Sequence, residues 1–347
     1  MAQNYFVTGG AGFIGSNYVY RLLQRREKVT VFDNLSRAGA PRNIAWLEGT
    51  FGKNAFNLIV GDVRSADLLV EAAREADVIV HLAGQVAVTT SVTDPRADFE
   101  ANAFGTFNVL EAARLSGRKP ICLYASTNKV YGGMDEVPLV EESTRWRYAD
   151  LPHGCSETQP LDFHSPYGVS KGAGDQYVHD YARIYDLPTV VFRQSAIYGP
   201  RQFGVEDQGW MAWFVIAAVM GRPITIYGDG KQARDMLYVD DLLNAYEVAV
   251  ERIEKVSGQV YNLGGGPQNV LAVWAEFGPI LEKLVGHPIE VARDDWRPGD
   301  QRVFYADTRK AERDLGWKPK IDLEEGIERL FKWVNENKGL FENDQTP

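Results

Sequence analysis

The fold expected of this chain follows from residues 4–15, which read Asn4-Tyr5-Phe6-Val7-Thr8-Gly9-Gly10-Ala11-Gly12-Phe13-Ile14-Gly15. Residues 4–8 predict a short buried strand, and a helical pattern follows the glycines to about Arg25. The glycines follow G-x-x-G-x-x-G, a turn one residue longer than G-x-G-x-x-G. Glycines let the backbone approach a pyrophosphate closely and leave the helix N-terminus open to its charge. The segment therefore predicts a dinucleotide-phosphate site, with an ordinary tight turn between strand and helix as the alternative.

A second strand followed by an acid favours the dinucleotide site. Residues 28–32 predict the strand, and Asp33 follows it about twenty residues beyond Gly12. A carboxylate there accepts hydrogen bonds from the adenosine ribose hydroxyls and disfavours a 2′-phosphate, which favours NAD over NADP. Arg37 lies near enough to leave that preference open. The strand, glycines, helix, second strand and acid together predict an NAD site.

The same alternation of strands and helices continues along the chain. Runs rich in Val, Ile and Leu occur at 56–60, 78–82 and 121–125, with a helix expected near 66–75 and a long helix over 95–115. Such runs are typical of a parallel sheet covered on both faces, so we predict an α/β fold, a Rossmann-type doubly wound parallel sheet. Ligands bind at the carboxyl ends of its strands. The candidates there are Asp62, Val63, Leu82, Ala83 and Gln85, with Asn102 in the long helix as a further cofactor contact.

Residues 165–171, Ser-Pro-Tyr-Gly-Val-Ser-Lys, predict the chemistry. Ser165 is a good N-cap and Pro166 suits the first helical position, so Tyr167 lies in the opening turn and Lys171 follows on the same face. The ammonium and the helix N-terminus both lower a phenol pKa that is about 10 when unperturbed. Tyr167 is then a general base, and an ordinary solvated helix pair is the alternative.

A hydroxyl group follows the strand predicted at 121–125. Thr127, at the carboxyl end of this strand, is placed to hydrogen-bond a substrate hydroxyl or to share its proton, whereas capping of the strand end by Ser126 and Thr127 is the alternative. The polar residues 133–164 are predicted either as a lid over the site or as a plain loop.

Composition limits the classes of partner and compartment. The net charge of −10 disfavours nucleic acid and anionic membranes, and the longest apolar run, 210–220, is far shorter than the ~20 residues of a spanning helix. Two cysteines do not build a disulfide framework, and no basic segment precedes the first strand, so a cytoplasmic protein without a signal peptide is expected. The five histidines show no ligand spacing, and no metal site is predicted.

The glycine turn, the hydroxyl after the fifth strand and Y-x-x-x-K together resemble the extended short-chain dehydrogenase/reductase family. The catalytic triad of that family then falls on Thr127, Tyr167 and Lys171. Further stretches resemble one subgroup, the CDP-tyvelose (CDP-paratose) 2-epimerases. These stretches are Asp-Asn-Leu-Ser-Arg at 33–37, Gln-Val-Ala-Val-Thr-Thr-Ser-Val at 85–92, Ser-Thr-Asn-Lys-Val-Tyr-Gly at 126–132, Arg-Gln-Phe-Gly at 201–204 and Asp-Gln-Gly-Trp at 207–210.

Two departures from sister subgroups bear on the reaction. Nucleotide-sugar 4,6-dehydratases carry acids directly after the strand-five threonine, where this chain has Asn128 and Lys129, so dehydration is disfavoured. UDP-sugar 4-epimerases usually place an Asn shortly after the arginine of the sixth strand, whereas Gln194 and Ser195 follow Arg193 here. This second departure puts 4-epimerase chemistry in doubt.

The resemblance implies an NAD-dependent epimerase of a nucleotide-diphosphate sugar. The implied reaction is C2 epimerisation of a CDP-hexose, of the type CDP-paratose to CDP-tyvelose or CDP-glucose to CDP-mannose, through a transient 2-keto intermediate with tightly bound NAD. A UDP-sugar 4-epimerase or another NAD-dependent nucleotide-sugar oxidoreductase is the nearer alternative, and a non-catalytic NAD-sensing protein is the more distant one. The sequence leaves the sugar and the base open.

Beyond Arg193 the glycine, proline and aromatic content rises, which predicts a smaller, interleaved substrate lobe. We expect the NAD-binding Rossmann domain at 1–193 plus about 236–262, and the nucleotide-sugar-binding lobe at 194–235 plus about 263–340. An amphipathic helix is expected over 317–333 and a disordered tail from 342. In the family, helices matching 95–115 and 167–185 pair across a two-fold axis, which implies a homodimer or a homotetramer.

The predicted cofactor contacts are Gly9, Gly12, Phe13, Ile14, Asp33, Asn34, Ser36, Arg37, Asp62, Val63, Leu82, Ala83, Gln85, Asn102, Tyr167, Lys171 and Ser195. The predicted substrate contacts are Thr127, Asn128, Arg201, Gln208, Gly209, Arg234, Arg297 and Asp300. Arginine forks grip a diphosphate bidentately. The resemblance assigns Arg234 and Arg297 to the nucleotide diphosphate and places Asp300 near the ribose.

Overall fold

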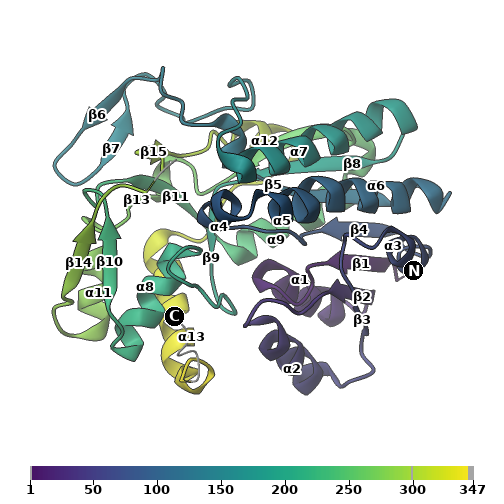
Figure 1. Cartoon of the computed structure of the whole chain (residues 1–347), viewed down its shortest axis with the longest axis horizontal. Helices are drawn as coiled ribbons and strands as arrows, with labels where there is room; N and C mark the ends of the chain where they lie inside the picture. The colour runs from purple at the N-terminus through teal and green to yellow at the C-terminus, as the bar shows by residue number, and fades with distance from the viewer. Residues whose placement is uncertain (1, 298–299, 343–347) are drawn as a thin grey trace.

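The computed structural model describes residues 2–297 and 300–342, and a parallel sheet forms its centre (Figure 1). Its seven strands have the order β12-β8-β5-β4-β1-β2-β3, and all neighbours are parallel. The predicted doubly wound sheet is confirmed. The strands are β1 (Asn4–Thr8), β2 (Lys28–Asp33), β3 (Asn57–Val60), β4 (Val78–His81), β5 (Ile121–Thr127), β8 (Thr189–Gln194) and β12 (Gln259–Leu263).

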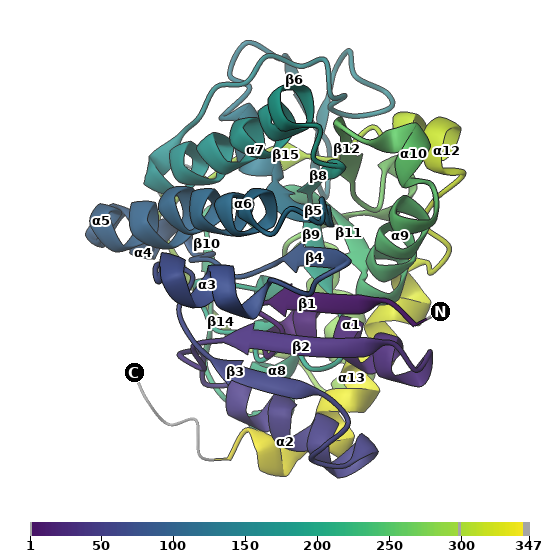
Figure 2. The ribbon, with the colours of Figure 1, turned by 90° about the vertical axis from the view of Figure 1, so that its right-hand side faces the viewer.

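Helices cover both faces of this sheet because side chains alternate along each strand. Tyr5 and Val7 of β1 pack in the core shared with α1, α2 and α9. Phe6, between them, packs in the core shared with α3, α6 and α7. Figure 2 shows α3, α6 and α7 in front of the sheet. The six helices are α1 (Phe13–Gln24), α2 (Ala40–Phe51), α3 (Ala66–Ala72), α6 (Gly105–Leu115), α7 (Ser165–Tyr185) and α9 (Val239–Glu251).

A second group of elements lies beside the sheet, at the left of Figure 1. It contains a four-stranded sheet in which β11 pairs with β9, β13 and β15. Strands β10 and β14 form a separate parallel pair. Strand β12 returns to the main sheet beside β8 after β10 and β11, so the two groups interleave along the chain. The elements are β9 (Ala196–Tyr198), α8 (Trp210–Met220), β10 (Ile224–Tyr227), β11 (Ala233–Tyr238), β13 (Val270–Ala272), α11 (Phe277–Val285), β14 (Val291–Asp294), β15 (Val303–Phe304) and α13 (Leu323–Glu336).

The polar segment 133–164 contains an antiparallel hairpin of β6 (Leu139–Glu141) and β7 (Trp146–Tyr148). The Trp146 indole N–H donates to Asp229 at 2.7 Å, and the Tyr148 hydroxyl donates to the carbonyl of Val303 at 3.1 Å. These bonds attach the hairpin to the second group of elements, so this part of the segment is a docked hairpin.

Two helices differ from their predicted limits. The helix expected over 95–115 divides into α5 (Pro95–Phe99), a π-helical segment η1 (Glu100–Phe104) and α6. The helix expected from 317 begins only at α13, because the Asp322 carboxylate accepts the Glu325 N–H and caps it there. The predicted disordered tail falls mainly on 343–347, outside the described residues. The remaining elements are α4 (Val88–Thr93), α10 (Ile253–Val256), α12 (Arg309–Leu315), η2 (Asn128–Tyr131), η3 (Pro267–Asn269) and η4 (Lys338–Leu340).

None of the helices in the described part of the chain combines the length and the apolar character that crossing a bilayer requires.

Candidate active site

The glycine turn joins β1 to α1 and lies against the loop that follows β4. Gly9 has a φ of +69°, and a Cβ at this position would lie 2.6 Å from the Ala83 nitrogen. At Gly15 a Cβ would lie 2.2 Å from the Gly9 carbonyl oxygen, so neither position accepts a side chain. Gly12 is the N-cap of α1 and provides no side-chain cap. The first N–H groups of α1 therefore lack a capping side chain, as in helix N-termini that bind phosphate.

Asp33 ends β2 beside this turn. Its carboxylate accepts the Ala11 N–H at 3.0 Å and the Leu35 N–H at 2.8 Å, so it ties the glycine turn to the loop after β2. Burial raises the pKa of Asp33, and the two backbone N–H groups oppose this shift. The carboxylate thus lies where the sequence predicted it, at the carboxyl end of the strand.

The loops after β2 and β3 carry the next predicted cofactor contacts. Asn34 donates to Asp62 at 3.0 Å and accepts the Ser36 N–H at 3.1 Å. Asp62 also pairs with Arg64 at 2.8 Å, which lowers the pKa of the carboxyl. The Val63 side chain is instead buried in the core.

The loop after β4 is held by a buried amide. Asn102 accepts the Gln85 N–H at 2.9 Å and donates to the Gln85 carbonyl at 3.0 Å. The Ala83 N–H donates to the Thr8 hydroxyl at 3.3 Å, and Leu82 packs at the edge of the core. Because Asn102 is completely buried and its amide is committed to these bonds, we assign it to support of the Gln85 loop.

The predicted catalytic residues are buried together at the carboxyl end of β5. Thr127 is the last residue of β5, and Tyr167 and Lys171 occupy successive turns of α7. The Lys171 ammonium donates to the carbonyl of Ala125 at 2.6 Å and lies 4.3 Å from the centre of the Tyr124 ring. Burial of Tyr167 and Lys171 excludes the alternative of an ordinary solvated helix pair.

The start of α7 differs in one detail from its prediction. The structure begins the helix at Ser165, whose φ is +63°, and His164 is the N-cap residue. The Ser165 hydroxyl nevertheless accepts the Gly168 N–H at 3.3 Å, which is the bond expected of a capping side chain.

The predicted fall in the Tyr167 pKa is not observed in the protein alone. Burial raises the pKa of Tyr167, and the hydrogen bond with Thr127 and the charge of Arg37 only oppose this shift. Burial also lowers the pKa of Lys171 to about 7, so its ammonium is easier to deprotonate than an exposed lysine. The prediction from the sequence did not include the loss of water around Tyr167 and Lys171, which disfavours the charged form of both groups.

A pocket of about 230 Å³ lies between Thr127 and Tyr167 on one side and the second group of elements on the other. The first residues of α1 and the segment after β8 both contribute to its wall. Ser195 lies in this wall and donates its hydroxyl to Asp235. The predicted site residues that line the pocket are Phe13, Ile14, Thr127, Tyr167, Ser195, Gln208 and Gly209.

Arg37 connects the loop after β2 to the other side of this pocket. Its guanidinium donates to the Gln208 side chain at 3.2 Å. Its charge also acts on Tyr167 and lowers the pKa of that phenol. Arg37 thus links a predicted cofactor contact with a predicted substrate contact.

Two of the three predicted substrate arginines lie in the second group of elements. Arg234, on β11, pairs with Asp300 at 2.7 Å. Arg297 pairs with Asp207 at 3.0 Å and lies 3.9 Å from the centre of the Tyr227 ring. Each arginine therefore has one carboxylate partner, and both pairs can exchange that partner for a phosphate.

Arg201 packs elsewhere. Its guanidinium lies 4.2 Å from the centre of the Trp46 ring and 5.6 Å from that of Trp333. The residue therefore joins α2 to α13, and a cation–π contact of this kind stabilises the packing of the two helices. The position in the sequence gave no sign of this stacking, because both tryptophans are distant along the chain.

Comparison with known proteins agrees with this geometry. The family model for GDP-mannose 4,6-dehydratase matches residues 6–330. The chain belongs to this family. CDP-paratose 2-epimerase of Salmonella typhi, a relative of this chain, is 42% identical over 336 residues, which cover 95% of this chain and 98% of that protein.

Solved structures of related enzymes extend the comparison. UDP-glucose 4-epimerase of Thermotoga maritima with UDP-glucose has a TM-score of 0.82 at 30% identity, and covers 96% of this chain and 99% of its own. The dTDP-glucose 4,6-dehydratase of Streptomyces venezuelae with NAD and TYD bound has a TM-score of 0.83 at 28% identity, and covers 97% and 98%. The predicted membership in the extended short-chain dehydrogenase/reductases is confirmed.

Two residues without a carboxylate, Asn128 and Lys129, follow Thr127. Asn128 and Lys129 both donate to the Gln301 side-chain oxygen, at 3.3 Å and 3.2 Å. The backbone carbonyl of Gln301 also accepts Arg234. Gln301 thus connects the catalytic strand to a predicted phosphate-binding arginine, and no sequence motif identifies it because it is an isolated glutamine.

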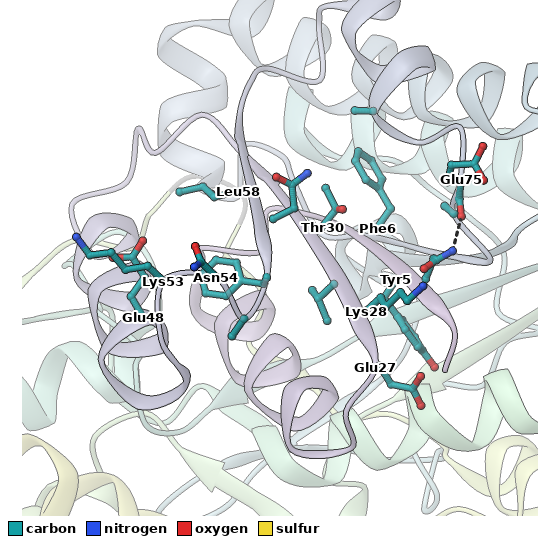
Figure 3. Close-up of a pocket in the computed structure, with 17 residues that line it drawn as sticks. Tyr5, Phe6, Glu27, Lys28, Thr30, Glu48, Lys53, Asn54, Leu58 and Glu75 are labelled. Atoms are coloured by element: carbon teal, nitrogen blue, oxygen red, sulfur yellow. Dashed lines mark hydrogen bonds between the residues drawn. The ribbon is translucent and has the colours of Figure 1, made fainter. Parts of the chain in front are cut away.

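A larger hollow of about 770 Å³ lies at the other end of the sheet (Figure 3). Its wall includes Asn4, Lys28 and Asn57, the first residues of β1, β2 and β3. Ligands of doubly wound sheets bind at the carboxyl ends of the strands. The smaller pocket beside Tyr167 is therefore the candidate active site.

Proposed function

We propose that the protein is an NAD-dependent epimerase that inverts C2 of a CDP-hexose. The observation that carries this proposal is the joint burial of Thr127, Tyr167 and Lys171 at the carboxyl end of β5 and the start of α7, with Asn128 and Lys129 rather than carboxylates after Thr127. An amide and an amine supply no second acid–base pair of the kind that removal of water needs. The 42% identity to a protein named CDP-paratose 2-epimerase supports the choice of carbon and nucleotide.

The residues around the glycine turn fit NAD. Gly9 and Gly15 let the turn pack closely on neighbouring backbone, and Gly12 leaves the N-terminus of α1 without a side-chain cap, so the N–H groups of this helix end can bind the diphosphate. Asp33 is placed to accept the adenosine ribose hydroxyls, and Lys171 and Tyr167 are assigned to the nicotinamide ribose. When bound, NAD supplies the reversible hydride acceptor that oxidation and re-reduction at one carbon require.

The side chains perform the proton transfer and hold the substrate. Tyr167 takes the proton of the C2 hydroxyl as a general base and returns it after the sugar has turned. Thr127 orients this hydroxyl, and Lys171 as an ammonium opposes the effect of burial on the phenol. Arg234 and Arg297 keep the diphosphate bound while the 2-keto sugar presents its other face.

Product analysis tests this proposal. The purified protein is incubated separately with CDP-glucose, CDP-paratose and UDP-glucose, and the products are identified by nuclear magnetic resonance. We expect inversion at C2 of a CDP-hexose, with no loss of water. Inversion at C4 of UDP-glucose would instead support the 4-epimerase alternative, and a 4-keto-6-deoxy product would support dehydration.

We further propose that the protein is a homodimer formed through α6 and α7, which lie side by side in Figure 2. Phe99, Phe104, Phe107, Tyr177 and Ile184 are exposed along α5, η1, α6 and α7. The rings of Phe107 and Tyr177 lie 6.0 Å apart and connect the two longer helices. Exposed apolar side chains gathered on neighbouring helices are typical of subunit contacts.

A further inference from the structure

Asp98, on α5, is a carboxylate buried completely inside the protein. Within residues 2–297 and 300–342, no lysine, arginine or histidine forms an ion pair with it. An unpaired buried charge costs several kcal/mol of stability. Stability therefore gives no reason for an acid at this position, and its surroundings indicate another reason.

Two short hydrogen bonds fasten Asp98 to the helix that carries the catalytic residues. The Ser170 hydroxyl donates to one carboxylate oxygen at 2.5 Å, and the Asn102 amide donates to the other at 3.0 Å. Ser170 directly precedes Lys171 and follows Tyr167 by three residues in α7. The negative charge of Asp98 is thus held beside the segment that links the phenol to the ammonium.

A second carboxylate near Lys171 is paired with an arginine. Asp175 is also buried, but Arg193 donates to both of its oxygens at 2.9 Å. The neighbouring His81 is neutral, because burial lowers its pKa to about 3. Both carboxylates raise the pKa of Lys171, Asp175 more than Asp98, but Asp175 is the one that Arg193 holds.

The same charges act on the phenol. Besides Asp98, Tyr167 is faced by Arg37 and by the hydroxyl of Thr127, and the ring of Tyr124, on β5, lies against Lys171. Burial raises the pKa of Tyr124 far above its usual value, so this phenol stays neutral. The charged groups that act on Tyr167 and Lys171 are then Arg37, Asp98 and Asp175.

We propose that Asp98 is a positioning residue whose buried charge holds Lys171 as an ammonium and delays ionisation of Tyr167. This inference rests on the proposed function for the roles of the two catalytic residues. The electrostatic directions agree with the geometry, since Asp98 raises the pKa of both Lys171 and Tyr167. Burial raises the pKa of Asp98 itself, and its hydrogen bonds and Lys171 oppose that shift.

A direct titration of the phenol tests the inference without any substrate. The ultraviolet absorbance of tyrosinate is followed with pH in the NAD-loaded wild type and in Asp98→Asn, and the Tyr167→Phe variant of each protein is subtracted to isolate one of the sixteen tyrosines. We expect the Tyr167 transition to move to lower pH by about one unit in Asp98→Asn. An unchanged transition would overturn the proposal.

Kinetics supply the second readout. In Asp98→Asn both limbs of the pH–rate profile are expected to move toward lower pH, because Tyr167 and Lys171 both lose a proton more readily. Ser170→Ala is the matched control, since it removes the same hydrogen bond and keeps the charge, and its limbs should move less. Equal displacement in both variants would assign Asp98 to packing alone.

Two other outcomes must be distinguished from failure of this inference. One is an unfolded variant, and the other is a wrong proposed function. Circular dichroism establishes the fold of Asp98→Asn, and Asp98→Ser serves as a second neutral variant if the first is unfolded. If no nucleotide sugar is epimerised, the proposed function fails, while the Tyr167 titration still decides the role of Asp98.

Discussion

Arg193 donates to both carboxylate oxygens of Asp175 at 2.9 Å, and the whole ion pair is buried beneath the catalytic residues. Asp175 lies on α7 and Arg193 on β8, and Asp175 also accepts the Ser126 hydroxyl at 2.7 Å. The pair therefore fixes α7 against the two strands that carry and flank Thr127.

This arrangement predicts a large effect of Arg193→Met on stability. The substitution leaves the Asp175 carboxylate buried without its cation, so we expect the free energy of unfolding to fall by about 3–5 kcal/mol in urea denaturation. Arg183→Met is the control, because its pair with Asp180 is exposed and should cost less than about 1 kcal/mol. Similar losses in both variants would contradict the importance of the buried pair.

Arg234 and Arg201 have different surroundings in the structure, so their substitution should affect CDP binding differently. Arg234→Gln should weaken binding of CDP, measured by calorimetry, by about tenfold or more, because a charge-assisted contact to the diphosphate is lost. Arg201→Gln should leave CDP affinity unchanged and lower the melting temperature, since Arg201 stacks on Trp46. A loss of CDP affinity in Arg201→Gln would return this residue to the substrate site.

The state of Lys171 predicts a pH dependence of stability. Its pKa of about 7 in the folded protein lies below the value of about 10.4 expected for an unfolded lysine. Between these values the unfolded chain binds more protons, so this group makes the free energy of unfolding rise with pH by up to about 1.4 kcal/mol per unit.

Lys171→Met removes this slope. The free energy of unfolding of the variant should exceed that of the wild type most below pH ~7, and the difference should shrink as the pH rises toward ~10. Denaturant unfolding at several pH values measures the difference, with the exposed Lys332→Met as control. A difference that is independent of pH would show that Lys171 keeps an ordinary pKa.

The features that the sequence predicted correctly are those set by residues close together along the chain. The strand, glycine turn and helix of residues 4–15, the acid at Asp33, and the placement of Thr127 and Tyr167 follow from spacing and strand ends, and the structure brings them to one pocket or its edge. A short segment contains the whole signal in each case.

The remaining features depend on contacts between distant parts of the chain. Gln301 meets Asn128, and Arg201 meets Trp46, only after the two groups of elements pack together. Burial of Tyr167 is likewise a property of the folded molecule, and in the protein alone it raises the pKa that local spacing predicted to fall. The π-helical segment at η1 accompanies the bonds of Asn102 to the Gln85 loop, which no helical pattern contains.

The apolar surface on α6 and α7 predicts a change of oligomeric state. Phe107→Asp places a charge in the middle of this surface, where burial against a second copy would be unfavourable, so we expect monomers in sedimentation velocity. Val60→Asp is the control, because Val60 is an exposed apolar residue on β3. Dissociation in the control alone would place the contact on another face.

Tyr167→Phe tests the chemical role of the phenol most directly. Phenylalanine keeps the ring that packs at the start of α7 and removes the group that exchanges a proton, so turnover should fall by at least about a hundredfold. CDP affinity should persist because Arg234 and Arg297 are unchanged. Tyr177→Phe, on the exposed face of the same helix, should retain wild-type turnover. Wild-type turnover in Tyr167→Phe would require another base, and the described residues that line the pocket include no other tyrosine, histidine, lysine or carboxylate to replace it.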